Sequence, residues 1–438
     1  MEWWVFLFII VASLLFLLFL GLPLAFTLGF LSTLSAIFLW PGLKGLKILS
    51  LTAYGSVNSF VMIAVPLFIL MAEVIMFSGL ASDAFDAALR WLGWLPGGLA
   101  VAGVAASAMF AAITGISTAN VATIGLVAVP EMLKRGYHKY LATGSIAAGG
   151  ALGILIPPSV IMIIYGVVAE ESIGKLFMGG IFPGFLLASL FMLYAAIRCW
   201  RNPSLGPPLR GIPWRERFAS LFRGGVWAVL LLAGMVLGSM YFGICTPTEA
   251  AALGAGGAII TALLYRKLNW ENLKHALLRT TRVTCMIIWI YFAASIFTTV
   301  MAKMGISTGL QEWVVGLKVS KWVILALIQL SLFFLGMILD PAGIVLLTVP
   351  IFLPIIRSLG FDPLWFGIIF TVNMEMAYIT PPFGFNLYVM KGIVPPEFGV
   401  SIGDIWRGCA PFVALQALGL ALVIIFPEIA LFLPSTMK

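Results

Sequence analysis

The chain has 438 residues, of which 62% are hydrophobic and only 10% are charged, and its mean hydropathy is +1.11. A soluble domain is about half apolar and about a quarter charged, so this composition excludes an ordinary soluble protein and indicates a membrane protein. The net charge of +8 does not indicate a nucleic-acid partner, because the lysines and arginines lie in loops between apolar runs. The four cysteines are scattered without CxxC spacing, so we expect neither a metal site nor a disulfide framework.

Apolar runs long enough to cross a bilayer recur along the whole chain, since a spanning helix needs about 20 apolar residues. The predicted fold class is therefore an all-α polytopic membrane protein. Two segments, 97–130 and 322–356, are apolar but broken in the middle. Each is predicted to be a re-entrant helical hairpin, the alternative being one or two ordinary spans. The ten predicted spans lie near residues 3–20, 22–40, 59–79, 141–168, 176–198, 224–243, 246–265, 283–302, 362–390 and 409–432.

Basic residues indicate the orientation, because lysine and arginine accumulate in cytoplasmic loops. If both broken segments are re-entrant, most of the 25 lysines and arginines fall on one side of the membrane. That side holds the loops 131–140, 198–223 and 266–282. The sequence therefore predicts that residues 201–223 form a cytoplasmic basic linker and that both termini are periplasmic.

The chain also repeats itself. The offset that takes Pro130 onto Pro354 also takes Pro157–Pro158 onto Pro381–Pro382. Short amphipathic segments at 80–96 and 306–319 precede the two broken hairpins, and such helices suit the membrane interface. We therefore predict two inverted repeats, an architecture that many secondary transporters share. The repeats are residues 1–200, with hairpin 97–130 and broken span 141–168, and residues 224–438, with hairpin 322–356 and broken span 362–390.

Polar residues gather at the predicted hairpin tips. The first tip, TGISTAN, offers side-chain oxygens from Thr114, Ser117, Thr118 and Asn120. In lipid, irregular backbone is tolerated only inside protein or beside a water-filled cavity. The second tip contains Gly336, Asp340 and Gly343.

The broken spans contain GGALGILIPPS and AYITPPFGFN. Each proline lacks an N–H, so carbonyls one turn earlier lose their partner and can face a cation. Hard cations prefer such oxygen ligands, and a set of mostly neutral ligands with one carboxylate fits sodium. The helix N-termini at the same breaks would attract an anionic substrate.

Each feature also has a structural explanation. Small hydroxyl residues are common where helices pack, and a single Pro–Pro pair is often only a kink, but both features occur twice in register. Asp340 is a functional candidate because it is an intramembrane carboxylate, the alternative being a structural pair or cap. Glu249 fits a capping box with Thr246, and Glu73 is predicted to brace the scaffold. Glu375 is left open between support and function.

These motifs together resemble the large membrane subunit of the tripartite ATP-independent periplasmic (TRAP) transporters, the DctM or SiaM type. The resemblance covers essentially the whole chain. It implies a sodium-driven importer of small organic acids, such as C4-dicarboxylates or sialic acid, working by an elevator mechanism in the bacterial inner membrane. The motifs that carry it are TGISTANVATIG, GGALGILIPPS, GICTPTEAAALGA, LDPAGIVLLTVPIFLP and NMEMAYITPPFGFNLYV.

The resemblance also implies partners: a small four-helix membrane subunit, expected as a separate chain, and a periplasmic substrate-binding protein, in addition to the surrounding membrane lipids. No cofactor is expected beyond sodium as the coupling ion. The chain has TGIST where many relatives have a more serine-rich tip, which leaves the substrate chemistry open. By motif position, the implied first sodium site is Ser117, Asn120, Gly153 and Pro157, the second is Asp340, Gly343 and Thr380, and the substrate site is Ser117, Thr118, Ser159, Asp340 and Asn386.

Two other functions fit parts of the sequence. One is a stand-alone sodium/dicarboxylate or citrate symporter of similar architecture that needs no binding protein. The other is an intramembrane enzyme, which would want a Ser–His or paired-Asp arrangement within spans. Both histidines, His138 and His275, lie in basic loops and look solvated, and only Asp340 lies deep. We therefore expect a transporter and not an enzyme.

Overall fold

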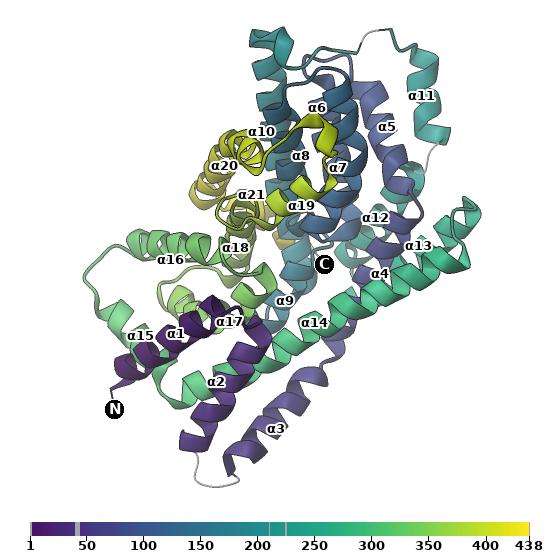
Figure 1. Ribbon diagram of the computed structural model, residues 1–438. Coiled ribbons are helices and arrows are strands. Elements are labelled where there is room, and N and C mark those ends of the chain that lie inside the picture. Colours follow the sequence, from purple (N-terminus) through teal and green to yellow (C-terminus); the bar gives the residue numbers. More distant parts are fainter. Residues whose placement is uncertain (1, 40–43, 210, 224–225, 438) are drawn as a thin grey trace.

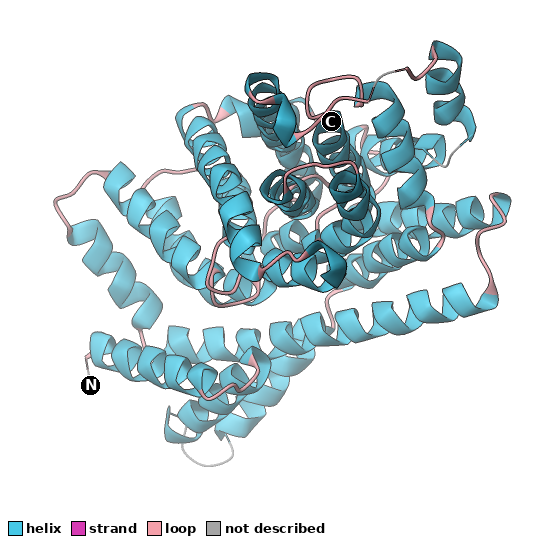
Figure 2. Cartoon of the chain, turned by 45° about the horizontal axis from the view of Figure 1, so that its top comes forward, coloured by secondary structure: helices cyan, strands magenta, loops and turns pink. Residues whose placement is uncertain are grey.

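The computed structural model describes residues 2–39, 44–209, 211–223 and 226–437. Within these ranges every regular element is a helix, which confirms the all-α class (Figures 1 and 2). In the described part of the chain, six helices are long and apolar enough to span a membrane, or seven if the bent pair α11–α12 is one span. The predicted number of ten spans includes α1 and α2, which have 17 and 16 residues. At 1.5 Å per residue these helices are about 25 Å long, slightly less than the ~30 Å hydrocarbon core.

One group of helices contains α14, which has 34 residues and is the longest helix in the described part of the chain. Helices α2, α3 and α4 pack along it, and α13 packs on α4 (Figure 1). The helices of this group are α1 (Trp3–Phe19), α2 (Leu24–Leu39), α3 (Lys44–Val57), η1 (Phe60–Ile63), α4 (Ala64–Phe77), α5 (Leu80–Leu92), α11 (Trp214–Arg223), α12 (Val226–Tyr241), α13 (Pro247–Leu264), α14 (Trp270–Lys303) and α15 (Ile306–Gly316).

The second group is a bundle in which segments from both halves of the sequence pack together. Helix α8 packs against α6, α7 and α20, and α18 packs against α10, α16 and α20. Its members are α6 (Gly98–Thr114), α7 (Ser117–Lys134), α8 (Lys139–Ala151), η2 (Leu152–Ile154), α9 (Val160–Ala169), α10 (Ile173–Arg201), η3 (Pro203–Leu205), α16 (Lys321–Gly336), α17 (Pro341–Ser358), α18 (Pro363–Tyr378), α19 (Phe385–Ile393), η4 (Pro396–Phe398), α20 (Ile402–Ile425) and α21 (Glu428–Thr436).

Four parts of the chain differ from the sequence-based expectation. Helix α14 begins at Trp270, capped by Asn269, and not near 283 as predicted. The sequence-based boundary is wrong because the first turns of this helix are polar and resemble a loop in hydropathy. Helix α3 is too polar to be recognised as a span, and α11 is a helix within the predicted linker 201–223. The predicted span 409–432 is in fact α20 and a separate helix, α21.

Glycine allows the closest helix contacts in the bundle. An added Cβ on Gly144 of α8 would lie 2.1 Å from the carbonyl oxygen of Gly408 in α20, and one on Gly408 would lie 2.4 Å from that of Tyr140. Small residues at such positions let helix backbones approach directly, which is a main source of packing energy in membranes. The contact holds the start of α8 beside the start of α20.

Candidate functional site

The first hairpin tip lies directly against the first broken helix. Helix α6 ends at Thr114, and α7 starts at Ser117. Between them, Gly115 has φ +60°, and an added Cβ there would lie 2.4 Å from the carbonyl oxygen of Pro158. The Val160 N–H donates to the carbonyl oxygen of Gly115 over 3.4 Å. Glycine is needed here for both its left-handed conformation and the close approach.

The other side of the tip approaches the η2 turn. An added Cβ on Gly153 would lie 3.1 Å from the carbonyl oxygen of Ile116 and 3.2 Å from the Cα of Ser117. The chain then turns at Pro157, and Ser159 caps α9, its hydroxyl accepting from the Met162 N–H at 3.3 Å. Backbone carbonyls around this break therefore lie beside the start of α7.

Ser117 is connected to the second half of the chain. The Asn386 Nδ2 group donates to the Ser117 hydroxyl at 2.8 Å and to the carbonyl oxygen of Ala147 at 3.1 Å. Both side chains are fully buried. Asn386 lies at the start of α19, just after the break at Pro381–Pro382. The structure thus brings together two residues assigned to the substrate site, whereas Thr118 beside them is partly exposed.

Asn120 has an oxygen with no protein partner. Its Nδ2 donates to the carbonyl oxygen of Ser107 at 2.9 Å, but its Oδ1 is buried and accepts no hydrogen bond from the described residues. The Ser107 hydroxyl is unpartnered as well. Leaving a buried polar atom unsatisfied costs about 1–3 kcal/mol, so such an atom needs a partner, which a bound ion or a water molecule can supply. Ser107 was not recognised from the sequence, since a lone serine in an alanine-rich helix is an ordinary packing residue.

The second hairpin tip lies against α18. An added Cβ on Gly336, the last residue of α16, would lie 2.4 Å from the Cβ of Ala377. Asp340 is the N-cap of α17, and its Oδ2 accepts from the Ala342 N–H at 3.0 Å. The capping role considered for Asp340 is therefore present. The Thr380 hydroxyl donates to the carbonyl oxygen of Met376 at 2.6 Å.

The structure does not bring all predicted residues together. Gly343 faces α2, since an added Cβ there would lie 2.1 Å from Leu24 Cδ2. Among the residues that the structure describes, no hydrogen bond joins the first tip to Asp340 or Gly343. Within the first predicted set the structure thus places Gly153 against Ser117. The second set lies at the start of α17 and just after the end of α18.

Additional polar residues lie inside the bundle. The side chain of Glu375 is fully buried, and neither carboxyl oxygen has a partner among the described residues. The neighbouring Asn373 donates to Gln329 Oε1 at 2.7 Å. Gln416 on α20 is buried with its amide unpaired by any described residue. Gln329 and Gln416 were missed, although polar residues inside apolar runs are the signal by which they can be found.

Two glutamates in apolar surroundings have structural roles. Glu73 forms an ion pair with Arg279, whose Nε lies 3.2 Å from Glu73 Oε1, and this joins α4 to α14. Glu249 completes a capping box with Thr246 at the start of α13, as predicted.

The helix ends define the electrostatics of the site. Helices α7, α9, α17 and α19 begin at the tips and breaks, whereas α6, η2, α16 and α18 end there. Helix N-termini carry partial positive charge and C-termini partial negative charge with free carbonyls. Each tip and each break can therefore attract an anion at its helix N-terminus and a cation at its free carbonyls.

Comparison with known proteins identifies the family. Residues 11–429 match the sequence profile of the family described as "Tripartite ATP-independent periplasmic transporter, DctM component". The chain is 35% identical to the C4-dicarboxylate TRAP transporter large permease protein DctM of Rhodobacter capsulatus, over 95% of this chain and 96% of that one. It is 34% identical to the Pseudomonas aeruginosa protein of the same name, over 88% and 89% of the two chains.

One further relative and one solved structure are also similar to this chain. The isethionate TRAP transporter permease protein DctMQ of Oleidesulfovibrio alaskensis is 35% identical over 94% of this chain and 64% of its own length. The YdaH transporter of Alcanivorax borkumensis superposes with a TM-score of 0.61 at 15% identity, covering 89% of this chain and 91% of the other, which shows a shared fold. The polytopic helices and these relatives identify a transporter and not an enzyme: the chain belongs to the DctM component family of the tripartite ATP-independent periplasmic transporters.

Proposed function

We propose that this permease is a sodium-coupled importer of small organic acids and the large transport subunit of a three-part system in the inner membrane. The observation that carries the proposal is the docking of the first hairpin tip on the first broken helix. There the unpaired Asn120 Oδ1 lies in the same buried region as Ser117 and the carbonyls near Gly153 and Pro157. Neutral oxygen atoms of this kind suit a hard monovalent cation.

The electrostatics support an anionic substrate. Four helix N-termini point to the tips and breaks, and such ends favour carboxylate groups. The relatives' names refer to C4-dicarboxylates and to isethionate, a sulfonate, and both are small anions. We assign substrate contacts to Ser117, Thr118, Ser159, Asp340 and Asn386. A second sodium site is assigned to the backbone and side chains of Asp340, Gly343 and Thr380.

Separate components are expected to complete the system. The isethionate relative is named DctMQ, and this chain covers only 64% of its length. We infer that the additional part of that protein corresponds to the small membrane subunit expected as a partner of this chain. A periplasmic binding protein, as the family description implies, would deliver the substrate.

An elevator movement is supported by the interface between the two helix groups. A cavity of about 580 Å³ lies between α3 and α14 on one side and α9 and α17 on the other. Ser295, Thr298 and Thr299 of α14 line it, and each of these hydroxyls already donates to its own helix. Because each of these hydroxyls has its single proton engaged within α14, none of them donates across the cavity to α9 or α17, and sliding at this place would break no such bond.

Uptake by reconstituted protein tests the function. Vesicles containing this chain with its small subunit, supplied with the binding protein, should accumulate radiolabelled succinate only when sodium is higher outside. Accumulation driven equally well by a potassium gradient would contradict sodium coupling. Sodium-driven uptake by this chain alone, without a binding protein, would favour the stand-alone symporter.

A further inference from the structure

A cavity with one apolar end and one basic end lies between α10 and α20, away from the hairpin tips. Its volume is about 460 Å³. A smaller cavity of about 260 Å³ shares Tyr194, Arg198 and Leu205 with it and extends toward the start of α8. The two are therefore parts of one recess on the outer surface of the bundle.

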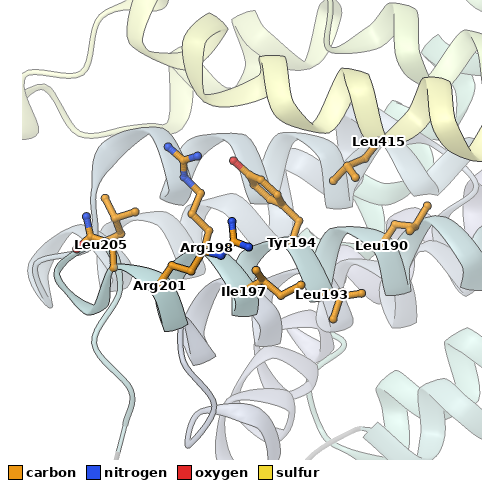
Figure 3. Close-up of a pocket in the computed structure, with 9 residues that line it drawn as sticks. Leu190, Leu193, Tyr194, Ile197, Arg198, Arg201, Leu205 and Leu415 are labelled. Carbon is orange, nitrogen blue, oxygen red and sulfur yellow. The ribbon is translucent and has the colours of Figure 1, made fainter.

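The apolar end is formed by Leu190, Leu193 and Ile197 of α10 with Leu415 of α20, as Figure 3 shows. Leu193 is 56% exposed, and Ile197 is 41% exposed. Exposed leucine and isoleucine on a membrane-spanning helix are in contact with lipid chains. This end of the recess is thus open to the hydrocarbon region.

The basic end contains Arg198 and Arg201 of α10, together with Arg407 and His138 from the adjoining cavity. In Figure 3 the guanidinium group of Arg198 lies beside the hydroxyl of Tyr194, at the opposite end from Leu190 and Leu193. Arg198 lies 5.9 Å from the centre of the Tyr194 ring. Helix α10 therefore presents hydroxyl and guanidinium donors where its apolar surface ends.

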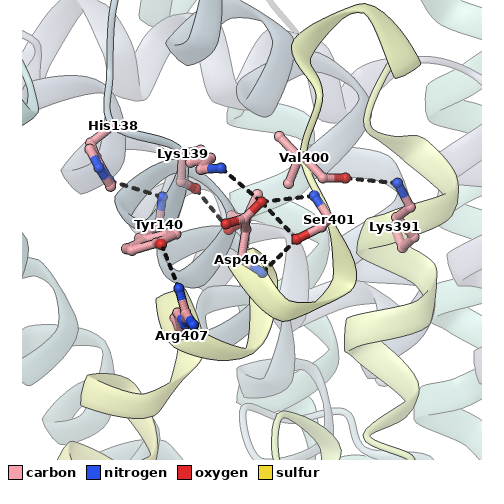
Figure 4. A network of polar contacts seen from close by, with 9 residues as sticks. His138, Lys139, Tyr140, Lys391, Val400, Ser401, Asp404 and Arg407 are labelled. Carbon is pink, nitrogen blue, oxygen red and sulfur yellow. Dashed lines mark hydrogen bonds and ion pairs between the residues drawn. The ribbon is translucent and has the colours of Figure 1, made fainter.

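These arginines lack carboxylate partners. Within the described part of the chain, Arg198, Arg201 and Arg407 form no ion pair. Asp404 lies one helical turn before Arg407 on α20, but Figure 4 shows it bound to Lys139 and Ser401 and not to Arg407. It is bound by Lys139 Nζ at 2.8 Å and by the Ser401 hydroxyl at 2.8 Å. Arg407 Nη1 donates to the Tyr140 hydroxyl at 3.4 Å, and the described residues offer it no carboxylate.

We propose that this recess is a binding site for one anionic glycerophospholipid of the cytoplasmic leaflet. The phosphate would accept hydrogen bonds from Arg198, Arg201 and Arg407, and an acyl chain would lie along Leu190, Leu193 and Leu415. Basic recesses between membrane helices on the cytoplasmic side are suited to anionic headgroups. Arginine binds phosphate through paired N–H donors. The proposal uses the predicted cytoplasmic position of loop 198–223 and does not depend on sodium coupling.

A simpler explanation covers only part of the site. Arginines in the last turn of a helix favour the negative end of its dipole, and this accounts for Arg198 and Arg201 alone. It does not account for Arg407, which comes from α20, or for the aligned apolar groove. The combination of an apolar groove and a cluster of arginines without carboxylate partners at its end favours a lipid.

Native mass spectrometry of the purified full-length chain tests the site. Dioleoylphosphatidylglycerol is titrated into wild type and into the double variant Arg198→Gln, Arg407→Gln. Each arginine near a lipid surface contributes about 1 kcal/mol, so the first binding step should weaken about 30-fold by the tenfold-per-1.4-kcal/mol rule. The matched control, Arg215→Gln with Arg282→Gln, removes two exposed arginines elsewhere and should stay within about twofold. If the glutamine variant does not fold, the double variant Arg198→Lys, Arg407→Lys takes its place. It keeps both charges, so its affinity for the lipid should fall by less than the ~30-fold expected for the glutamine variant.

Titrations with other molecules identify the ligand. Dioleoylphosphatidylcholine should bind at least tenfold more weakly, and soluble glycerol 3-phosphate should not displace the lipid at equal concentration. Equal loss in the control pair would mean general surface attraction and would overturn the site. Tight binding of glycerol 3-phosphate alone would mean a soluble anion. Displacement of the lipid by the small membrane subunit would show that the recess is a protein interface.

Discussion

At the residue scale, the unusual feature is a set of buried polar atoms with few partners. Asn120 Oδ1, the Ser107 hydroxyl and both carboxyl oxygens of Glu375 are unpaired within the described residues. A soluble core would satisfy or exclude such groups. Their position at the hairpin tip and along α18 fits ligand binding better than packing.

Asn120→Ala and Ser117→Ala should raise the sodium concentration for half-maximal uptake. Loss of a ligand of hydrogen-bond strength costs about 1–3 kcal/mol, or about 5- to 150-fold in affinity. Ser117→Ala should have the broader effect, since it also removes a partner of Asn386. Val129→Ala is the control, because Val129 is fully buried in α7 but away from the tip. It should lower thermal stability without moving the sodium curve. If the Asn120 and Ser117 variants also lose stability without moving the sodium curve, the tip serves packing and does not bind sodium.

Asp340 can be tested by separating its charge from its capping role. Asparagine is also a good N-cap, so Asp340→Asn should keep α17 intact while impairing sodium-driven uptake at least tenfold. Asp340→Ala should lose uptake and about 1 kcal/mol of stability as well. The measurements are initial uptake rate and thermal unfolding of the same preparations. Normal uptake by the asparagine variant would assign Asp340 to capping alone.

At the element scale, local chemistry predicted the interruptions well. The Pro–Pro pairs mark where the broken helices stop, because proline removes the N–H that the preceding turn needs. Gly115 marks the first tip because only glycine enters its conformation easily. The sequence could not reveal that Asn386 contacts Ser117, since the two are 269 residues apart. It also could not show that Gly343 faces Leu24, which depends on how α2 packs.

The contact of α8 with α20 offers a test of packing between elements. Gly144→Val should destabilise the protein by about 1–3 kcal/mol or prevent folding, because its Cβ would overlap the Gly408 carbonyl. Gly256→Ala in α13 is a matched control, since no atom lies within 4 Å of the added Cβ. That change should be neutral or stabilising, as alanine favours helix. Thermal unfolding in detergent distinguishes the two. Equal midpoints for Gly144→Val and wild type would contradict the close contact.

At the scale of the whole molecule, the orientation in the membrane is the main prediction. A cysteine at Ser204, introduced into a background without the four native cysteines, should resist an impermeant maleimide added outside intact cells. Ser204 is exposed, whereas Gly206 is unsuitable because an added Cβ would lie 2.7 Å from Tyr137. The same site should react after the membrane is permeabilised. Rapid labelling from outside would overturn the predicted inverted repeats.

The length of α14 constrains any movement of the molecule. Its 34 residues contain no glycine or proline, so the helix has no residue at which it bends easily. At 1.5 Å per residue it is about 51 Å long. This length exceeds the ~30 Å thickness of the hydrocarbon core, so α14 must be tilted or must extend beyond the membrane. Because α2, α3 and α4 pack along α14, we expect this group of helices to be rigid. The proposed elevator movement would then be a movement of the bundle relative to α14, with α14 itself keeping its shape.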